Sequence, residues 1–186
     1  MKSSDLRREE NYNEYLRLLQ DDDFVEVMYD EQSGGVSAVH KQHKFAKKMG
    51  VYGIRQGDYE RKVLEVLRDR GHRIVLGAEP NNPGIKSFDG FLDDVPTEIK
   101  AIEGRGTWAV STKLLQAEQQ HARCVVLYFP EADLYSQLRI SEGVRLFQSA
   151  LNCDRQQDLQ RIIVLVRDQL VSDWNKKATP IEGWSI

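Results

Sequence analysis

The fold is decided by residues 87–102, SFDGFLDDVPTEIKAI, together with the apolar run CVVLYF at residues 124–129. Two short strand-like segments, 87–92 and 97–102, lie on either side of the turn-forming pair Asp93-Asp94. This pattern predicts a β-hairpin. The apolar run that follows is typical of a strand buried on both faces. The stretch therefore predicts neighbouring strands inside a sheet.

The segments around this stretch predict helices packed on that sheet. Tyr59, Val63 and Leu67 recur at helical spacing, with Asp58 as the expected N-cap and Gly71 as the expected stop. Further elements are expected as a strand over 72–78, helices over 107–122 and 140–151, and a strand over 162–166. The order from residue 57 is therefore helix, strand, strand, strand, helix, strand, helix, strand, which predicts an α/β domain with a mixed sheet.

The N-terminal part predicts an extension to this domain. Residues 1–20 resemble a short polar helix, and residues 24–29 and 35–40 predict a second β-hairpin that lies outside the sheet. We divide the chain into residues 1–50, with the helix, the hairpin and a basic linker, residues 51–175, with the α/β domain, and a C-terminal tail, residues 176–186.

Composition excludes several classes of protein. Of the 186 residues, 40% are hydrophobic, yet no apolar run reaches the length of a membrane span, and the N-terminus does not resemble a signal peptide. The two cysteines, Cys124 and Cys153, provide neither a disulfide framework nor a zinc site. We expect a cytoplasmic protein without a membrane partner, and delivery into another cell stays open.

Charge is unevenly distributed along the chain. Residues 1–31 carry a net charge of −6, residues 32–75 carry +6 and residues 76–104 carry −4. A basic block beside an acidic one suits a polyanion held next to a bound cation. Lys41, Lys44, Lys47 and Lys48 are the candidate nucleic-acid contacts of the basic block, and we interpret His40 and His43 as part of the same solvated arm. The alternative is an uneven solvated surface.

A candidate catalytic site lies on the predicted hairpin at residues 87–102. Glu98 and Lys100 are two positions apart on a strand, so both side chains leave the same face. Pairing across the turn brings Asp89 close to Glu98, and Glu60 lies on a helix that can pack over the same end of the sheet. A second acid-x-lysine triplet, at residues 60–62, lies on a predicted helix, where positions two apart diverge.

Three carboxylates and a lysine suit phosphodiester hydrolysis. Mg²⁺ prefers oxygen ligands and takes one or two carboxylates together with water and substrate phosphate. A lysine beside the metal can hold the attacking water or stabilise charge in the transition state. Two structural alternatives stay open: Asp89-Gly90 can be a simple turn or bulge, and Glu98 and Lys100 can be a solvated strand face.

These motifs resemble the PD-(D/E)xK nuclease superfamily. The similarity rests on Phe88-Asp89 followed by Glu98-Ile99-Lys100, covers about residues 57–130, and has Phe88 at a tolerant position where the superfamily name has proline. More closely, the segments SFDGFLDDVPTEIKAIEG and CVVLYF resemble nuclease domains of contact-dependent growth-inhibition toxins and of some phage and mobile-element proteins.

The resemblance implies a restriction-endonuclease-like αβββαβ core and a nuclease that acts on DNA or tRNA. It implies Asp89 and Glu98 as ligands of Mg²⁺ or Mn²⁺, Glu60 as a further acid at the metal, and Lys100 as the catalytic lysine. Gln119 and Gln120, on the helix after the motif, are both candidates for positioning substrate or water. A toxin of this kind would also have a cognate immunity protein as a partner.

Two further residues, Arg105 and Thr107, flank the start of a predicted helix. Free N–H groups favour phosphate there, although Thr107 suits helix capping equally well. The alternatives to a nuclease are a catalytically silent phage or mobile-element interaction module and a small nucleic-acid-binding domain. The oligomeric state is open.

Overall fold

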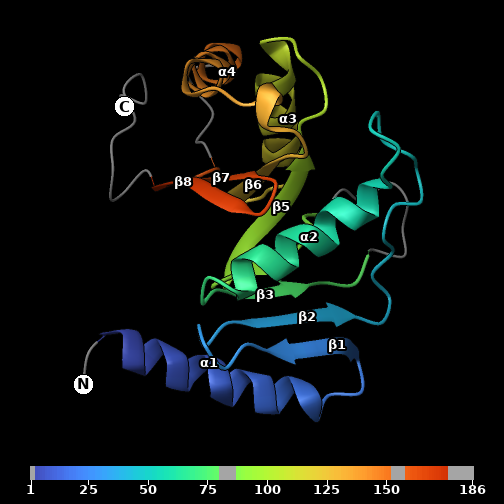
Figure 1. The fold of residues 1–186 in the computed structure, drawn as a ribbon, viewed down its shortest axis with the longest axis vertical. Helices are drawn as coiled ribbons and strands as arrows, with labels where there is room; N and C mark the ends of the chain where they lie inside the picture. The colour runs from blue at the N-terminus through green and yellow to red at the C-terminus, as the bar shows by residue number, and fades with distance from the viewer. Residues whose placement is uncertain (1–2, 80–86, 152–157, 176–186) are drawn as a thin grey trace.

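The computed structural model describes residues 3–79, 87–151 and 158–175, and within them the chain forms one eight-stranded mixed sheet with helices on both faces (Figure 1). The strands are β1 Phe24–Tyr29, β2 Val36–His40, β3 Arg73–Leu76, β4 Gly90–Leu92, β5 Val95–Ala101, β6 Cys124–Phe129, β7 Arg161–Val166 and β8 Gln169–Asn175. The helices are α1 Ser3–Leu19, α2 Gln56–Arg68, α3 Trp108–Gln119 and α4 Gln137–Ala150, with a short 3₁₀ helix at Ala132–Leu134. The expected tail at 176–186 and Cys153 lie outside the described residues.

The strands lie in the sheet in the same order as in the chain. The pairs β2–β3, β5–β6 and β6–β7 are parallel, and the other neighbouring pairs are antiparallel. Each parallel pair is connected through a helix, because a chain that returns to the same end of a sheet needs a crossover. The result is an α/β sheet of mixed strand direction.

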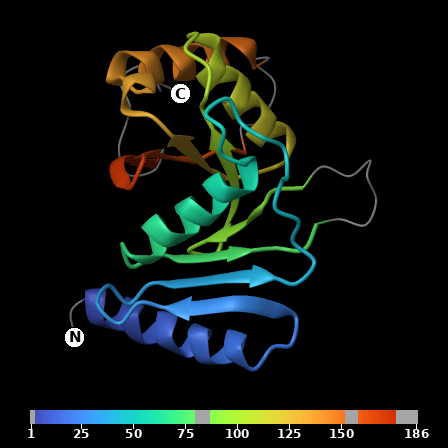
Figure 2. The same ribbon diagram turned by 45° about the vertical axis from the view of Figure 1, so that its right-hand side comes forward.

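The helices divide the core into separate layers. Helix α2 covers one face, where Val63 and Leu67 pack against Ile74, Ile99 and Val126 of the sheet. On the opposite face, α1 covers the β1–β2 end, while α3 and α4 pack together over β5, β6 and β7 (Figures 1 and 2). The β6 strand is fully buried, as its apolar run predicts.

The order of elements predicted from residue 57 is confirmed, and strand β8 is an element that the sequence did not predict. The prediction that the N-terminal hairpin lies outside the sheet is wrong, because β2 pairs in parallel with β3 from Val36 to Val39. Val36 and Ala38 pack beneath α1, whereas Val39 packs beneath α2. A strand with both faces buried belongs to the interior of a sheet.

The β4–β5 hairpin forms around the predicted turn. Asp93 and Asp94 both adopt positive φ angles, at 50° and 65°, as the central residues of a tight hairpin do. Strand β4 begins at Gly90 and is shorter than predicted. A Cβ atom at Gly90 would lie 2.2 Å from the carbonyl oxygen of Val75, so glycine allows β4 to approach β3 closely. Asp89 therefore lies directly before the first residue of β4.

Two helix starts differ from expectation. Helix α2 begins at Gln56 after Arg55, which places Asp58 within the first turn rather than at the N-cap. Thr107 precedes α3, but its side chain makes no capping hydrogen bond. None of the helices in the described part of the chain is both long and apolar enough to cross a membrane.

Candidate functional site

Asp89 and Glu98 meet where β4 and β5 stop pairing. The backbone N–H of Ile99 donates to Asp89 Oδ2 at 2.7 Å, and the backbone N–H of Asp89 donates to Glu98 Oε2 at 3.0 Å. The last paired residues of the two strands are Gly90 and Thr97. The Asp89 carboxylate therefore accepts from the backbone of β5, the Glu98 carboxylate accepts from the backbone just before β4, and these two bonds hold both acids in fixed positions.

Lys100 shares a face of β5 with Glu98, as the strand period predicts. Its ammonium group donates to Glu98 Oε1, and the Glu98 side chain is only 1% exposed. Ile99, between them, points to the opposite face and packs in the core beneath α2. Glu98 is therefore a buried carboxylate with Lys100 as its cation, which contradicts the alternative of a solvated strand face.

The acid pair is short of positive charge. Burial first, and the charge of Glu98 second, raise the pKa of Asp89 to about 7. Burial also raises the pKa of Glu98, although Lys100 acts in the opposite direction. Two close carboxylates with one lysine, which is bonded to Glu98, carry an excess negative charge when both are ionised. A cation bound beside them would remove this cost.

These residues line one cavity of about 290 Å³, between α2, α3 and the β4–β5 end of the sheet. Six of the predicted site residues lie in its wall. They come from the linker between β2 and α2 (residues 41–55), from α2, from the β4–β5 hairpin and from the end of α3: Lys44, Glu60, Asp89, Glu98, Lys100 and Gln120. The structure thus brings together residues that are far apart in sequence. It also adds His43 and Lys113, which the sequence did not point to as cavity residues.

His43 is buried, and the expectation that it belongs to a solvated arm is wrong. Its side chain is 3% exposed, Nδ1 lies 3.1 Å from the carbonyl oxygen of Gly77 and Nε2 lies 3.1 Å from Glu60 Oε2. Burial lowers the pKa of His43, but the hydrogen bond and charge of Glu60 outweigh it, so the net pKa is raised. Since an ionised Glu60 and a carbonyl are both acceptors, this geometry favours an imidazolium that donates to both.

The position of His43 depends on a close contact between the linker and α2. The N–H of Gly57 donates to the carbonyl of Ala46 at 3.0 Å, and a Cβ atom at Gly57 would lie 2.6 Å from that of Phe45. Phe45 also packs edge-on against the His43 ring and beneath the Arg61 guanidinium. In the sequence, Gly57 is the local feature that indicates a close contact at the start of α2. It does not indicate that Phe45 and Ala46 make that contact.

The structure separates the two candidate glutamines. Gln120 lines the cavity, donates from Nε2 to the carbonyl of Ser87 at 3.1 Å and hydrogen-bonds Glu98. Gln119 is exposed and lies outside the cavity wall. Gln120 is therefore the residue that can orient a group next to Glu98.

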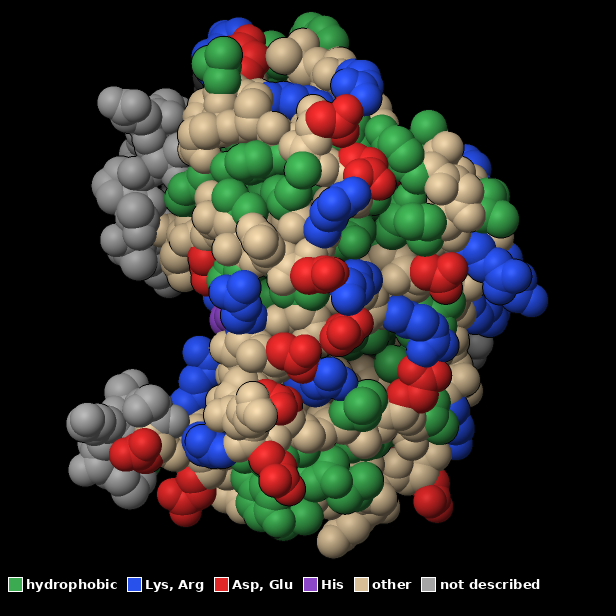
Figure 3. Space-filling model, viewed as in Figure 1, with side chains coloured by type: hydrophobic (Ala, Val, Ile, Leu, Met, Phe, Trp, Pro, Cys, Tyr) green, Lys and Arg blue, Asp and Glu red, His purple; other side chains and the backbone are tan. Residues whose placement is uncertain are grey.

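The remaining candidates lie outside the cavity wall. Lys41 pairs with Asp23 at 2.6 Å, while Lys47 and Lys48 are exposed on the linker. Arg105 pairs with Asp133, and Thr107 is exposed at the start of α3. Figure 3 shows acidic and basic side chains interspersed over the face that it displays, so the charge blocks of the sequence do not become separate patches there.

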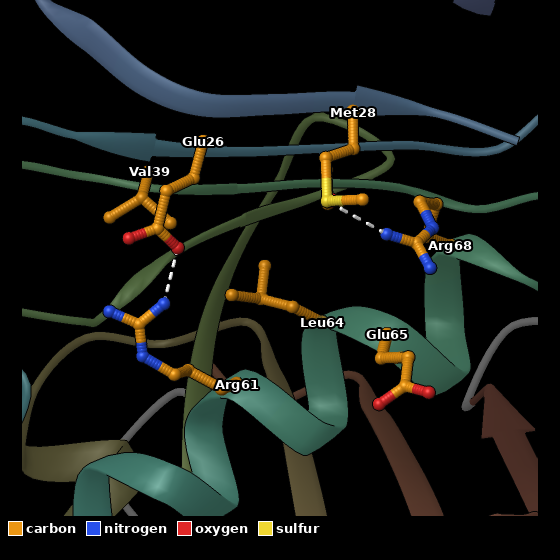
Figure 4. A pocket seen from close by; sticks show the side chains of 8 residues that line it. Glu26, Met28, Val39, Arg61, Leu64, Glu65 and Arg68 are labelled. Atoms are coloured by element: carbon orange, nitrogen blue, oxygen red, sulfur yellow. Dashed lines mark hydrogen bonds and ion pairs between the residues drawn. The ribbon is translucent and has the colours of Figure 1, made fainter.

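A second cavity, of about 380 Å³, lies between α2 and the β1–β2 hairpin (Figure 4). Its charged side chains are already paired: Arg61 donates to Glu26, and Arg68 donates to Asp69 and to the Met28 sulfur. This cavity contains no pair of unneutralised acids comparable to Asp89 and Glu98 among the residues that line it. Among the described residues of the two cavities, the acids suited to bind a cation therefore line the first one.

The donor set in the first cavity fits a hard divalent cation. Within residues 3–79, 87–151 and 158–175 no group of three or more His, Cys, Asp or Glu side chains is arranged to hold a metal ion. Two carboxylates with water and substrate oxygens nevertheless suffice for Mg²⁺. Burial and the charge of Glu98 raise the pKa of Asp89, and a bound cation would act in the opposite direction. Comparison with protein-family models, with curated proteins and with solved structures finds no match for this chain.

Proposed function

We propose that the protein is a divalent-metal-dependent nuclease of the PD-(D/E)xK kind, which hydrolyses phosphodiester bonds in DNA or tRNA. One observation carries this proposal: Asp89, Glu98 and Lys100 meet in a single cavity, where Glu98 is buried, Asp89 is partly buried and Lys100 is the one cation bonded to the pair among the described residues. A structural ion cluster would be neutralised by its own side chains. A pair of acids that keeps an excess of negative charge at the wall of an open cavity is instead suited to a cation and a substrate.

Asp89 and Glu98 are the residues that would hold Mg²⁺, with Mn²⁺ as a substitute. When bound, the ion acidifies water and neutralises charge on the phosphodiester. Glu60 is less suited to a direct role than the sequence suggested, because one of its oxygens is already bonded to His43. It supplies a further negative charge that acts on Asp89 from the α2 side.

Lys100 and Gln120 have distinct roles in this proposal. The Lys100 ammonium, bonded to Glu98 at the cavity wall, can donate to an attacking water or to a phosphate oxygen. Gln120 is held by Ser87 and hydrogen-bonds Glu98, so it fixes the orientation of that carboxylate. Both residues act on groups whose positions the hairpin already determines.

The proposed substrate is a polyanion, and the linker supplies the first cations that it would meet. Lys44 lies at the cavity, and Lys47 and Lys48 are exposed on the same segment. Exposed lysines of this kind bind phosphates without regard to base sequence. We further propose a toxin-type nuclease, which acts in the cytoplasm of the producing or of a recipient cell and has a cognate immunity protein.

Incubation with plasmid DNA and total tRNA, with Mg²⁺ and with EDTA, tests the proposal. The expected result is cleavage of at least one substrate in Mg²⁺, its loss in EDTA, and its loss in Asp89→Asn. Glu65→Gln is the matched control, since Glu65 is an exposed acid on α2 that does not line the cavity. Retardation of nucleic acid without cleavage would support a binding domain. If neither cleavage nor retardation is observed, the result would support a catalytically silent module.

A further inference from the structure

Lys113 is a cation in the cavity that the proposed chemistry does not yet use. It lies in the middle of α3, and its side chain lines the cavity together with Asp89, Glu98 and Lys100. The residue is partly buried, unlike the exposed lysines of the linker. The backbone of Lys113 is held in a helix, whereas the backbone of Lys44 lies in a loop.

Unlike Lys100 and His43, and unlike the exposed Lys44, Lys113 is a partly buried cation of the cavity without a fixed partner among the described residues. Lys100 is paired with Glu98, and His43 is bonded to Glu60. Among the residues that the structure describes, no hydrogen bond or ion pair within 4.0 Å holds the Lys113 ammonium. A lysine that is removed from water without a partner is unfavourable unless a ligand supplies the opposite charge.

Two other lysines act on Lys113. Burial first, and the charge of Lys100 second, lower its pKa, and Lys48 acts in the same direction. Glu103 and Glu98 act in the opposite direction, but their effect is not large enough to reverse the shift. Lys100 lines the cavity with Lys113, whereas Lys48 lies exposed on the linker.

We propose that Lys113 binds a phosphate oxygen of the nucleic-acid backbone inside the cavity, while Asp89 and Glu98 hold the cation on the other side of that phosphate. This inference rests on the proposed function and adds a substrate-binding residue to it. An anion at this position relieves the repulsion between Lys113 and Lys100 and replaces the water that the ammonium has lost. The ligand is recognised as a phosphodiester of single-stranded or duplex nucleic acid.

A purely structural role would have Lys113 pack its aliphatic stem against the cavity wall and extend its charge to solvent. Lys113→Met keeps most of that stem and removes the charge, whereas Lys113→Arg keeps a cation of greater length. Lys62→Gln is the matched control, since Lys62 is a partly buried lysine on α2 that pairs with Glu65 and Asp168 outside the cavity. Unchanged melting temperatures would show that each variant is folded.

The experiment measures binding by fluorescence anisotropy, in Mg²⁺ and over a range of salt concentrations. The probes are a labelled single strand and a labelled duplex, both with phosphorothioate linkages that slow hydrolysis. Lys113→Met is expected to weaken binding of at least one probe about tenfold, or about 1.4 kcal/mol. The slope of log affinity against log salt concentration should fall by about one, as the loss of one phosphate contact predicts. Lys113→Arg and Lys62→Gln should stay close to the parent.

Steady-state cleavage separates this inference from the proposed function. If the parent cleaves and Lys113→Met has the parent's KM, binding affinity and salt slope, the inference is overturned while the nuclease proposal stands. If the parent does not cleave but Lys113→Met still loses binding, the phosphate site stands and the nuclease proposal fails. A raised KM with a smaller change in kcat is the expected result, since the contact is present in the bound substrate.

Discussion

The two ends of the β4–β5 hairpin hold two partly buried aspartates whose electrostatic surroundings are opposite. Asp89, before β4, accepts from the backbone N–H of Ile99, and Asp93, after β4, accepts from the backbone N–H of Arg73. Burial tends to raise the pKa of both carboxyl groups. Their pKa values nevertheless shift in opposite directions, so burial alone does not decide the behaviour of either acid.

Asp93 is surrounded by cations from three parts of the chain. Arg7 of α1 lies 2.7 Å away, His72 lies 2.8 Å away and Arg161 of β7 lies 3.3 Å away. Hydrogen bonds from His72 and the Arg73 backbone, with the charges of His72 and Arg7, outweigh burial and hold the pKa of Asp93 well below its usual range. These ion pairs connect α1 and β7 to the hairpin, and they neutralise Asp93 without a bound cation.

Asp89 has the opposite arrangement, because the charge that affects its pKa most is the carboxylate of Glu98. Lys100, the cation that lowers the pKa of Asp89, is bonded to Glu98. The cations that the fold places beside each acid therefore distinguish Asp93, which is neutralised within the chain, from Asp89, which we propose binds an external cation. Substitutions at the two ends of the hairpin should separate these two kinds of acid.

Lys100→Ala should lower cleavage activity by about two to four orders of magnitude, the usual effect of losing a group that moves a proton or stabilises transition-state charge. Metal binding should persist, because the substitution removes a positive charge beside the metal site. Glu98→Gln should instead weaken metal binding, and excess Mn²⁺ should recover part of its activity. A cleavage time course at several metal concentrations measures both effects, and parental activity in Lys100→Ala would contradict the site assignment.

Asp93→Asn should destabilise the metal-free protein by about 2–3 kcal/mol, because it leaves Arg7, His72 and Arg161 without their common acceptor. Asparagine tolerates the positive φ angle at this position, so backbone strain does not explain the loss. Asp89→Asn should cost less or increase stability, since it removes repulsion from Glu98. Urea unfolding measures both variants, and a larger loss in Asp89→Asn would reverse the comparison.

The pH dependence of stability should also distinguish the two acids. The folded-state pKa of Asp89, about 7, lies above the ordinary value of 3.8, so its protonated form favours folding. This contribution is complete below pH 4 and is lost as the pH rises through 7, with a slope of at most about 1.4 kcal/mol per pH unit. Asp89→Asn should lack the loss between about pH 4 and pH 7. The same loss in both proteins would show that another group is responsible.

The linker lysines should give the smallest effects. Lys44→Gln, Lys47→Gln and Lys48→Gln should each weaken nucleic-acid binding slightly and evenly across base sequences, with a lower salt slope. Lys41→Gln should change binding less, because Lys41 is already paired with Asp23. Salt titrations of binding measure the four variants. An equal or larger effect for Lys41 would show that substrate competes successfully for this lysine.

The parts of the site that were predicted from sequence depend on local pairing. The turn at Asp93-Asp94 fixes the register of β4 and β5, and that register alone brings Asp89 beside Glu98 and places Lys100 on the same face. The hairpin β1–β2 was expected outside the sheet because its pairing with β3 spans more than 30 residues and has no turn signal.

The residues that were missed depend on tertiary packing. His43 reaches Glu60 because the linker folds back on Gly57, and the sequence around His43 contains only a basic run. Lys113 is an ordinary helix lysine until α3 packs beside β5. Gln119 and Gln120 could not be separated, because a shift of one residue at the end of a helix changes which side chain faces the sheet.

Calorimetric titration of the metal-free protein with Mn²⁺ tests directly whether Asp89 and Glu98 bind a cation, with Asp89→Asn and Asp93→Asn as the paired variants. We expect the parent and Asp93→Asn to bind the ion with similar affinity and Asp89→Asn to bind it at least tenfold more weakly. Binding to the parent below pH 7 should release protons. If the parent takes up no Mn²⁺, or if Asp89→Asn binds it as tightly as the parent, the acid pair of the hairpin is not a cation site.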